Sequence, residues 1–180
     1  MNKFTTLGRF NGDWRHLLPD LILQSQELTT KELSSTTDLI SANPDDFVNS
    51  ATNLHATFLK MCEIIGLKNA VNKIHVQMPG QVFLTHVDNL SSQFNAPDCN
   101  IMRVVIMLTE WEHGHINQYD GEIYSNWKSG DIHTFDWKHT PHCSANAGHN
   151  PRISIITSGI ISDRTKRFMY HNINKKQTGN

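Results

Sequence analysis

From residue 72 to residue 160, apolar and polar residues alternate with a period of two. This period indicates β-strands, because successive side chains of a strand point to opposite faces. Turn-forming residues such as Pro79-Gly80 and Asp120-Gly121 divide the segment into short runs. The predicted strands are 73–78, 82–88, 101–109, 113–118, 121–125, 131–137, 141–146 and 151–160. So many short strands in succession predict an antiparallel sandwich or barrel.

The segment before residue 72 has a different pattern, which predicts mainly helical support for the strands. Asn43-Pro44-Asp45-Asp46 places acids where a helix begins, and Gly66 is a natural end. Between them apolar residues recur every three or four positions, at Phe47, Ala51, Leu54, Phe58, Cys62 and Ile65. His55 lies beside this stripe, and we interpret it as a flanking residue and not a ligand. Residues 17–23 could form a short helix or an edge strand.

Length and composition predict one cytoplasmic α+β domain, 1–180. The chain has 180 residues, 38% of them hydrophobic, and a formal net charge of −1. Cys62, Cys99 and Cys143 are widely spaced and odd in number, which favours a reducing compartment. We find no signal peptide and no apolar run long enough to span a bilayer. The basic segment 162–180 is predicted to be a polar, partly disordered tail.

His86 and Asp88 are the first candidate metal ligands. At positions i and i+2 of one strand, their side chains share a face and can converge on one ion. A third ligand must come from another strand, and we choose His142 because it lies inside a predicted strand. The remaining candidates stand in turns or other runs, and they are His113, His115, His133, His139 and His149.

Two imidazoles and one carboxylate leave three positions of an octahedral ion open, as in non-haem Fe(II) oxygenases. A structural zinc would need a fourth ligand, usually cysteine. Cys143 adjoins His142 and therefore points to the opposite face of the strand. A catalytic zinc with three protein ligands and a water is compatible with the same ligand count.

Arg152 and Ser154 form a candidate anion site. They are also at i and i+2, and an Arg fork beside a hydroxyl is a good receptor for a carboxylate. On a strand next to that of His142, they could hold the far end of a chelating diacid. The alternative is a surface arginine paired with a nearby acid, Asp131 or Asp136.

Taken together, His86-x-Asp88, His142 and Arg152-x-Ser154 resemble the HxD…H…RxS pattern of 2-oxoglutarate/Fe(II)-dependent oxygenases. The resemblance covers residues 74–160. Three further features look like the aspartyl/asparaginyl and proline hydroxylase branch: Pro79-Gly80-Gln81, Arg103 at the start of a strand, and His142-x3-Asn146 before Pro151.

This resemblance implies a double-stranded β-helix (jelly-roll, cupin-like) core over 72–161, with the N-terminal helices packed on one sheet. It implies Fe(II) bound by His86, Asp88 and His142, with 2-oxoglutarate and O2 as co-substrates. Arg152 and Ser154 would bind the C5 carboxylate of 2-oxoglutarate, and Arg103 the carboxylate beside the iron. The implied reaction hydroxylates an amino acid or a peptide side chain (Pro, Asp or Asn) and releases succinate and CO2. The presence of Asp88 favours hydroxylation over halogenation.

Two other functions stay open. A cupin-like metalloprotein of the same fold could lack oxygenase activity, as a zinc isomerase or hydrolase would. A non-enzymatic sandwich could serve as a binding module. We expect a small-molecule or peptide partner, and neither a membrane nor a nucleic acid, because no basic, aromatic-interleaved surface stands out. The sequence does not indicate the oligomeric state.

Two groups of residues near the site could be functional or merely structural. Trp111, Trp127, Phe135 and Trp137 could line a substrate pocket or pack in the core. The segment 89–100 directly follows the His86 strand, and it could be a lid or an ordinary connection.

Overall fold

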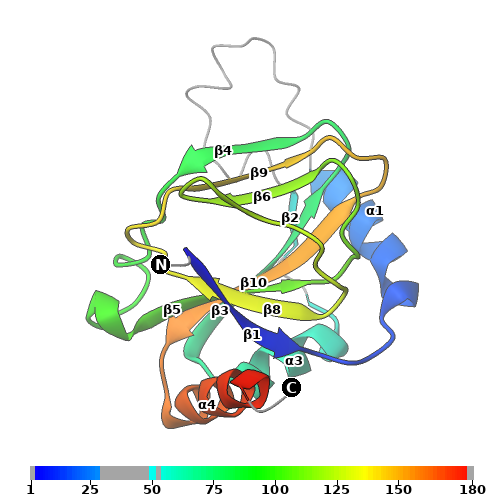
Figure 1. Cartoon of the computed structure of the whole chain (residues 1–180). Coiled ribbons are helices and arrows are strands. Elements are labelled where there is room, and N and C mark those ends of the chain that lie inside the picture. The colour runs from blue at the N-terminus through cyan, green and yellow to red at the C-terminus, as the bar shows by residue number, and fades with distance from the viewer. Residues whose placement is uncertain (1–2, 29–48, 52–53, 178–180) are drawn as a thin grey trace.

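In the computed structural model, residues 3–28, 49–51 and 54–177 are described. Their strands form two antiparallel sheets that lie face to face (Figure 1). The larger sheet has the order β1-β8-β5-β10-β3-β2, and the smaller has the order β4-β9-β6-β7. This is the expected double-stranded β-helix sandwich. The strands are β1 Phe4–Arg9, β2 Asn49–Ala51, β3 Lys68–Gln77, β4 Val82–His86, β5 Ile101–Met107, β6 His115–Tyr119, β7 Glu122–Tyr124, β8 Asp131–Phe135, β9 His142–Asn146 and β10 Arg152–Ile160.

All eight predicted strands are confirmed, with differences at their ends, the greatest in β3, which begins at Lys68 and not at residue 73. The largest difference that bears on the site is in β4, which ends at His86 and not at residue 88. The pairing of β4 with β9 also shifts register between Phe83 and His86. Asp88 therefore lies beyond the strand, in the segment that leads away from it.

Strands β1 and β2 were not predicted, and they add strands to a segment, 1–71, that was expected to be mainly helical. β1 pairs with β8, and its register shifts between Thr6 and Gly8. Leu7 is its only buried residue, so the strand has no regular alternation of apolar side chains. β2 has three residues and pairs with the edge of β3. Both strands depend on pairing with a distant strand, which a local pattern does not reveal.

The predicted long helix is shorter than expected. Helix α3, Ala56–Ile65, begins after His55, whose side chain accepts a hydrogen bond from the backbone N–H of Thr57. Ala51, which was assigned to the same stripe, belongs to β2, and residues 43–46 lie outside the described residues. The end was predicted correctly, because Gly66 adopts the left-handed conformation with φ 79°. Upstream, residues 15–28 form a short 3-10 turn, Arg15–Leu17, and helix α1, Leu18–Leu28.

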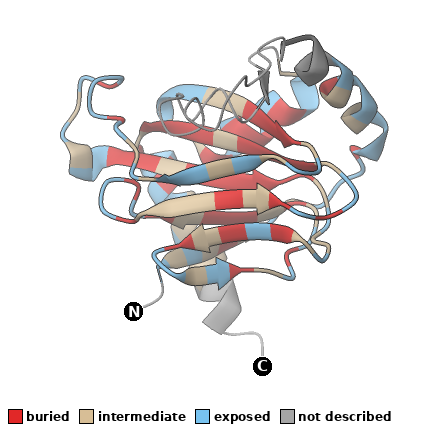
Figure 2. Cartoon of the chain, turned by 90° about the horizontal axis from the view of Figure 1, so that it is seen from above, coloured by how far each residue is buried: buried red, intermediate tan, exposed pale blue. Residues whose placement is uncertain are grey.

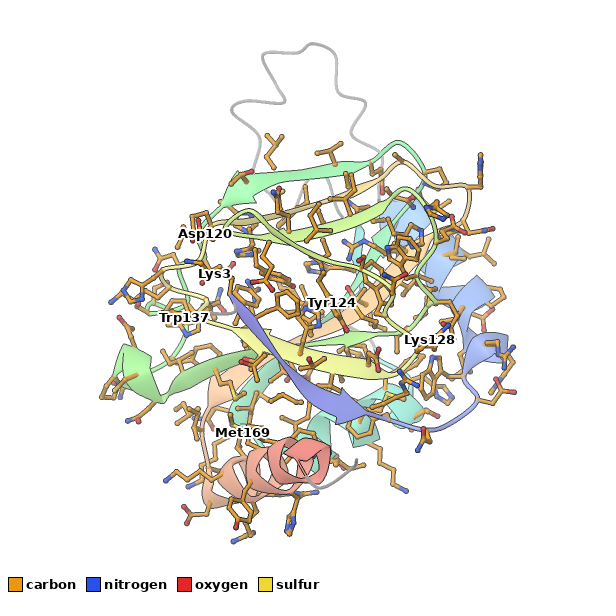
Figure 3. The ribbon with its side chains drawn as sticks, in the orientation of Figure 1. Lys3, Asp120, Tyr124, Lys128, Trp137 and Met169 are labelled. Atoms are coloured by element: carbon orange, nitrogen blue, oxygen red, sulfur yellow. The ribbon has the colours of Figure 1, made fainter. Side chains whose placement is uncertain are left out.

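The basic C-terminal segment is helical, which corrects the prediction of a partly disordered tail. Helix α4 spans Asp163–Gln177, and Thr165 at its start is fully buried. Phe168 and Met169 pack against the core, and Figure 3 shows Met169 on the helix beneath the larger sheet. The segment carries many charges, but these apolar residues recur on one face and bury it. None of the described helices is long and apolar enough to cross a membrane.

Two apolar cores lie on opposite faces of the larger sheet. One fills the space between that sheet and helices α1, α3 and α4, and it includes Phe58, Ile65, Val104 and Ile155. The other lies between the two sheets and is rich in aromatic side chains, among them Tyr124 (Figure 3). Viewed from above, the strands show buried residues alternating with partly buried or exposed ones (Figure 2). The second core fills only part of the space between the sheets, and the rest is a cavity.

Candidate metal centre

Two neighbouring strands of the smaller sheet bring His86 and His142 together. The two residues are directly opposite in the β4–β9 register, and their ring centroids are 4.2 Å apart. The Nε2 atoms of His86 and His142 lie 3.5 and 3.7 Å from the carboxylate oxygens of Asp88. Ligand atoms about 2.1 Å from a shared ion would lie about 3–3.5 Å apart, so this spacing fits one metal ion. One potential ligand atom from each of the three residues lies within 4.8 Å of the others, so the triad could bind a metal.

Backbone carbonyls orient both imidazoles toward the centre. Nδ1 of His86 donates to the carbonyl of Leu84 at 2.8 Å, and Nδ1 of His142 donates to that of Thr140 at 3.1 Å. Each Nε2 therefore keeps its lone pair on the side of Asp88, which is the tautomer that a metal ligand requires. The residues present fit a divalent transition metal.

Charge and burial keep the donors in the state that binds metal. Arg103, from β5, forms an ion pair with Asp88. Burial works to raise the pKa of Asp88, but the charge of Arg103 and the hydrogen bond from its guanidinium oppose this effect, and the pKa is held at about 2. Burial lowers the pKa of His142 to about 4. Near neutral pH the carboxylate is charged and the His142 imidazole is neutral.

Arg152 lies between the sheets, deep in the molecule and only 5% exposed. Its Nε donates to Oε1 of Gln77 at 2.8 Å, and one terminal nitrogen donates to Oγ of Ser144 at 2.8 Å. Burial lowers its pKa to about 10, so it stays charged at neutral pH. In the described part of the chain no carboxylate forms an ion pair with it. A buried cation with only neutral partners is a strong receptor for an anion.

This finding contradicts the alternative interpretation of Arg152 as a surface residue. Asp131 pairs instead with Arg9, and Asp136 with His139. Ser154 lies on the same face of β10 as Arg152 and is 2% exposed. The prediction that Arg152 and Ser154 share one inward face of a strand is therefore correct.

A single cavity of about 310 Å³ joins the triad to Arg152 and Ser154. Arg103 also lines it, so every residue that we singled out for metal or anion binding faces the same space. Phe135 packs against His142 with a centroid distance of 4.6 Å and forms part of the wall.

The other candidate histidines lie elsewhere among the described residues. His113, His139 and His149 are exposed. His115 is buried, and its Nε2 contacts the carbonyl of Asn150 at 3.1 Å. His133 is also buried, and its Nε2 is hydrogen-bonded to the hydroxyl of Tyr119 at 2.5 Å. The choice of His142 over these residues agrees with the geometry.

Of the four aromatic residues singled out, only Phe135 lines the cavity. Trp127 and Trp137 are buried in the core between the sheets, and Trp111 packs against it. The segment 89–100 is anchored in the same core by Leu90 and Phe94, and a short 3-10 turn, Asp98–Asn100, ends it. Asn89, Leu90 and Gln93 contribute to the cavity wall.

The sequence analysis missed several residues of the site, although the alternation of polar residues in their strands indicates them. Lys73, His75 and Gln77 are the polar half of the alternation in β3, and all face inward toward the cavity or toward Arg152. Ser144 is two residues from His142 and therefore shares its face. A strand whose polar residues line the interior can indicate a binding site, because burial of polar groups is costly without a partner.

Comparison with known proteins supports the fold. A Pseudomonas putida prolyl-4-hydroxylase superposes with a TM-score of 0.56 at 15% identity, over 89% of this chain and 93% of that protein. A predicted oxalate decarboxylase from Thermotoga maritima matches with a TM-score of 0.42 at 14% identity, over 63% of this chain and 81% of that one. A cupin 2 conserved barrel domain protein from Salinispora arenicola also gives 0.42, at 12% identity, over 79% and 98%. No protein-family model matches the sequence, and no curated protein is significantly similar to it.

The fold and the site together define a class of protein. The chain has a double-stranded β-helix, cupin-like fold, with a His86-Asp88-His142 group that could hold a metal ion. At such low identity the likeness to the prolyl-4-hydroxylase shows a shared fold.

Proposed function

We propose that this protein is a 2-oxoglutarate- and Fe(II)-dependent dioxygenase that hydroxylates an amino acid or a peptide side chain (Pro, Asp or Asn), with release of succinate and CO2. One observation carries the proposal: the metal-ligand triad and the uncompensated cation Arg152 face the same cavity. A diacid that chelates a metal with one end needs an anion receptor for the other end. A simple metal site would not need that buried arginine.

In this proposal His86, Asp88 and His142 hold the iron, which supplies the site for activating O2 and for chelating the keto acid. Arg152 and Ser154 grip the far carboxylate of the co-substrate, with Gln77 and Ser144 fixing the guanidinium. Arg103 orients Asp88 and keeps it ionised. Arg103 lines the cavity and its buried Nε has no hydrogen-bond partner, so we assign it to the carboxylate that would lie beside the iron.

The wall of the cavity would limit the access of water. Phe135 packs against the ring of His142. Leu90, which is 4% exposed, contributes to the wall from the segment 89–100. Exclusion of water strengthens the electrostatic contacts inside and protects a strong oxidant from side reactions. The likeness of the fold to that of the Pseudomonas putida prolyl-4-hydroxylase supports a hydroxylase.

The test needs no primary substrate. Fe(II) and 2-oxoglutarate are added to the metal-free protein without oxygen, and the visible metal-to-ligand charge-transfer band of the chelate is recorded. The variants Asp88→Ala, His142→Ala and Arg152→Ala are measured in parallel. His139→Ala is the matched control, because His139 is an exposed histidine outside the triad. We expect the band in the wild type and in the control, and a weak or absent band in the other three.

Iron binding without the band would contradict the proposal and favour the cupin-like metalloprotein without 2-oxoglutarate chemistry. Absence of metal binding would show that the triad is not a metal site. We also propose a cytoplasmic location, supported by Cys62, Cys99 and Cys143, all of which are free thiols.

A further inference from the structure

His75 is a buried polar residue to which neither the metal centre nor the arginine site has given a role. It lies on β3, directly opposite Ser154 of β10, and is 7% exposed (Figure 1 shows the two strands). Its side chain lines the cavity, and its Nε2 has no hydrogen-bond partner among the described residues. A buried imidazole nitrogen without a partner costs free energy, so its position in a cavity wall indicates contact with a bound ligand.

Gln77, two positions further along β3 and on the same face, behaves differently from His75. The Oε1 of Gln77 accepts a hydrogen bond from Nε of Arg152 at 2.8 Å, and its Nε2 donates to the carbonyl of Ser144 at 3.2 Å. Both ends of the Gln77 amide are therefore used within the protein, whereas His75 keeps a polar atom for the cavity. The contrast indicates that Gln77 supports the arginine and that His75 faces the ligand itself.

Packing holds the His75 ring in place without occupying its Nε2. The ring makes an edge-to-face contact with Phe83 of β4, at a centroid distance of 6.2 Å. Phe83 in turn contacts His86 at 4.5 Å, so it is itself held in the wall of the cavity. A side chain that is already fixed loses little conformational entropy when a ligand binds to it.

The charges near His75 favour an anionic ligand. Burial, together with the charges of Arg103 and Arg152, lowers the pKa of His75 to about 3, so the ring is neutral at neutral pH. A neutral imidazole has one N–H to donate. Near two guanidinium groups the natural acceptor for that N–H is an anion, because the same cations attract it.

The register of the larger sheet places His75 beside the receptor for the far carboxylate. Opposite residues of antiparallel strands have Cβ atoms about 4.5–5.5 Å apart, so His75 and Ser154 can donate to the same carboxylate. Met107, the opposite neighbour of Ser154 on β5, has no polar hydrogen to donate. Arg103 pairs with β10 four residues beyond Ser154, about 13 Å along the strand. The backbone of His75 is therefore nearer to that of Arg152 than to that of Arg103.

From these observations we propose that His75 binds the far carboxylate of the keto-acid co-substrate together with Arg152 and Ser154, and that it helps to select a dicarboxylic over a monocarboxylic 2-oxo acid. The inference rests on the proposed function and adds to it a residue that sets co-substrate specificity. Arg152 supplies the charge, and Ser154 and His75 supply directed hydrogen bonds. A 2-oxo acid without the far carboxylate leaves all three groups without a partner, which is costly in a buried site.

The experiment compares two 2-oxo acids of equal chain length, 2-oxoglutarate and 2-oxopentanoate. Both have the same chelating end, and only 2-oxoglutarate has the far carboxylate. Each is titrated without oxygen into the complex of the protein with Fe(II), and the charge-transfer band gives its dissociation constant. We expect the wild type to bind 2-oxoglutarate about 100-fold or more tightly than 2-oxopentanoate.

Three variants assign part of that preference to His75. His75→Phe keeps a ring but has no donor, so it should weaken 2-oxoglutarate binding by about 10-fold or more and 2-oxopentanoate binding by less than about 3-fold. His75→Gln places an amide near the position of Nε2 and should restore part of the affinity, whereas the shorter His75→Asn should restore less. Fe(II) affinity, measured in parallel, should stay unchanged in all three. If His75→Phe does not fold, the difference between the Gln and Asn variants decides the test.

Two results would overturn the inference while the proposed function stands. Equal weakening of both acids would mean that His75 only supports the cavity wall. Unchanged binding of both acids would mean that His75 does not contact the co-substrate. If the wild type shows no band with 2-oxoglutarate, or binds both acids equally, the proposed function fails and this inference fails with it.

Discussion

At the scale of single residues, the most informative feature is a buried arginine whose described partners are all neutral. Gln77 and Ser144 satisfy part of the Arg152 guanidinium but leave its charge uncompensated. We predict that Arg152→Lys weakens 2-oxoglutarate binding by about 10-fold or more, because an ammonium retains the charge but loses the planar fork. Arg152→Met should weaken it by about 100-fold or more, since the charge is lost as well.

Separate measurements of metal and co-substrate affinity check this prediction. The hydrogen-bond partners of Arg152 are Gln77 and Ser144, not the triad, so Fe(II) affinity should change by less than about 3-fold in both variants. An equal loss of metal and 2-oxoglutarate binding in Arg152→Met would indicate a collapsed site and would contradict the assigned role.

At the scale of elements, the start of α4 is joined to the end of α3. The carbonyl of Gly66 accepts hydrogen bonds from the hydroxyls of Ser162 at 2.5 Å and Thr165 at 2.8 Å. Ser162 and Thr165 also cap the helix reciprocally through backbone N–H groups, at 3.1 Å each. The joint holds α4 against the core beneath the larger sheet.

We predict that Thr165→Val lowers the free energy of unfolding by about 1–3 kcal/mol, because the shape is kept while a fully buried hydroxyl and its bonds are lost. Urea denaturation measures the change, and Thr165→Ser, which keeps the hydroxyl, should lose less. An unchanged stability in Thr165→Val would mean that the segment behaves as the solvated tail that its charges suggested.

At the scale of the whole molecule, two histidines buried between the sheets make the free energy of unfolding depend on pH. Burial lowers the pKa of His75 and of His133 to about 3, against an ordinary value of 6.5. The unfolded chain therefore takes up protons below pH 6.5 that the folded protein cannot take up until about pH 3. The stability these groups contribute is complete above pH 6.5 and falls as the pH is lowered.

For the metal-free protein, lowering the pH from 7 to 5 should cost about 2 kcal/mol for each of these two histidines. Urea denaturation at both pH values measures the loss. His133→Phe should reduce the loss by about one histidine's share, whereas the exposed His139→Ala should leave it unchanged. An equal loss in the wild type and His133→Phe would mean that His133 is not buried as a neutral ring.

The sequence alone was sufficient for eight strands, the end of α3 and the placing of His86, His142, Arg152 and Ser154 on inward faces. These features follow from local rules, since a strand repeats every two residues and a glycine tolerates the left-handed conformation. Local rules also relate side chains two residues apart. They explain why the positions of these four side chains could be predicted from short spacings.

Only the tertiary structure decided the rest. β1 and β2 form because distant strands offer free edges, and α4 is ordered because its apolar face meets a core built elsewhere. Asp88 reaches the centre from beyond the end of β4, where Arg103 from another strand holds it. The neutral partners of Arg152 and the unpaired Nε2 of His75 are likewise products of packing between strands. Pairing, burial and charge balance arise between residues far apart in the chain, so no local pattern contains them.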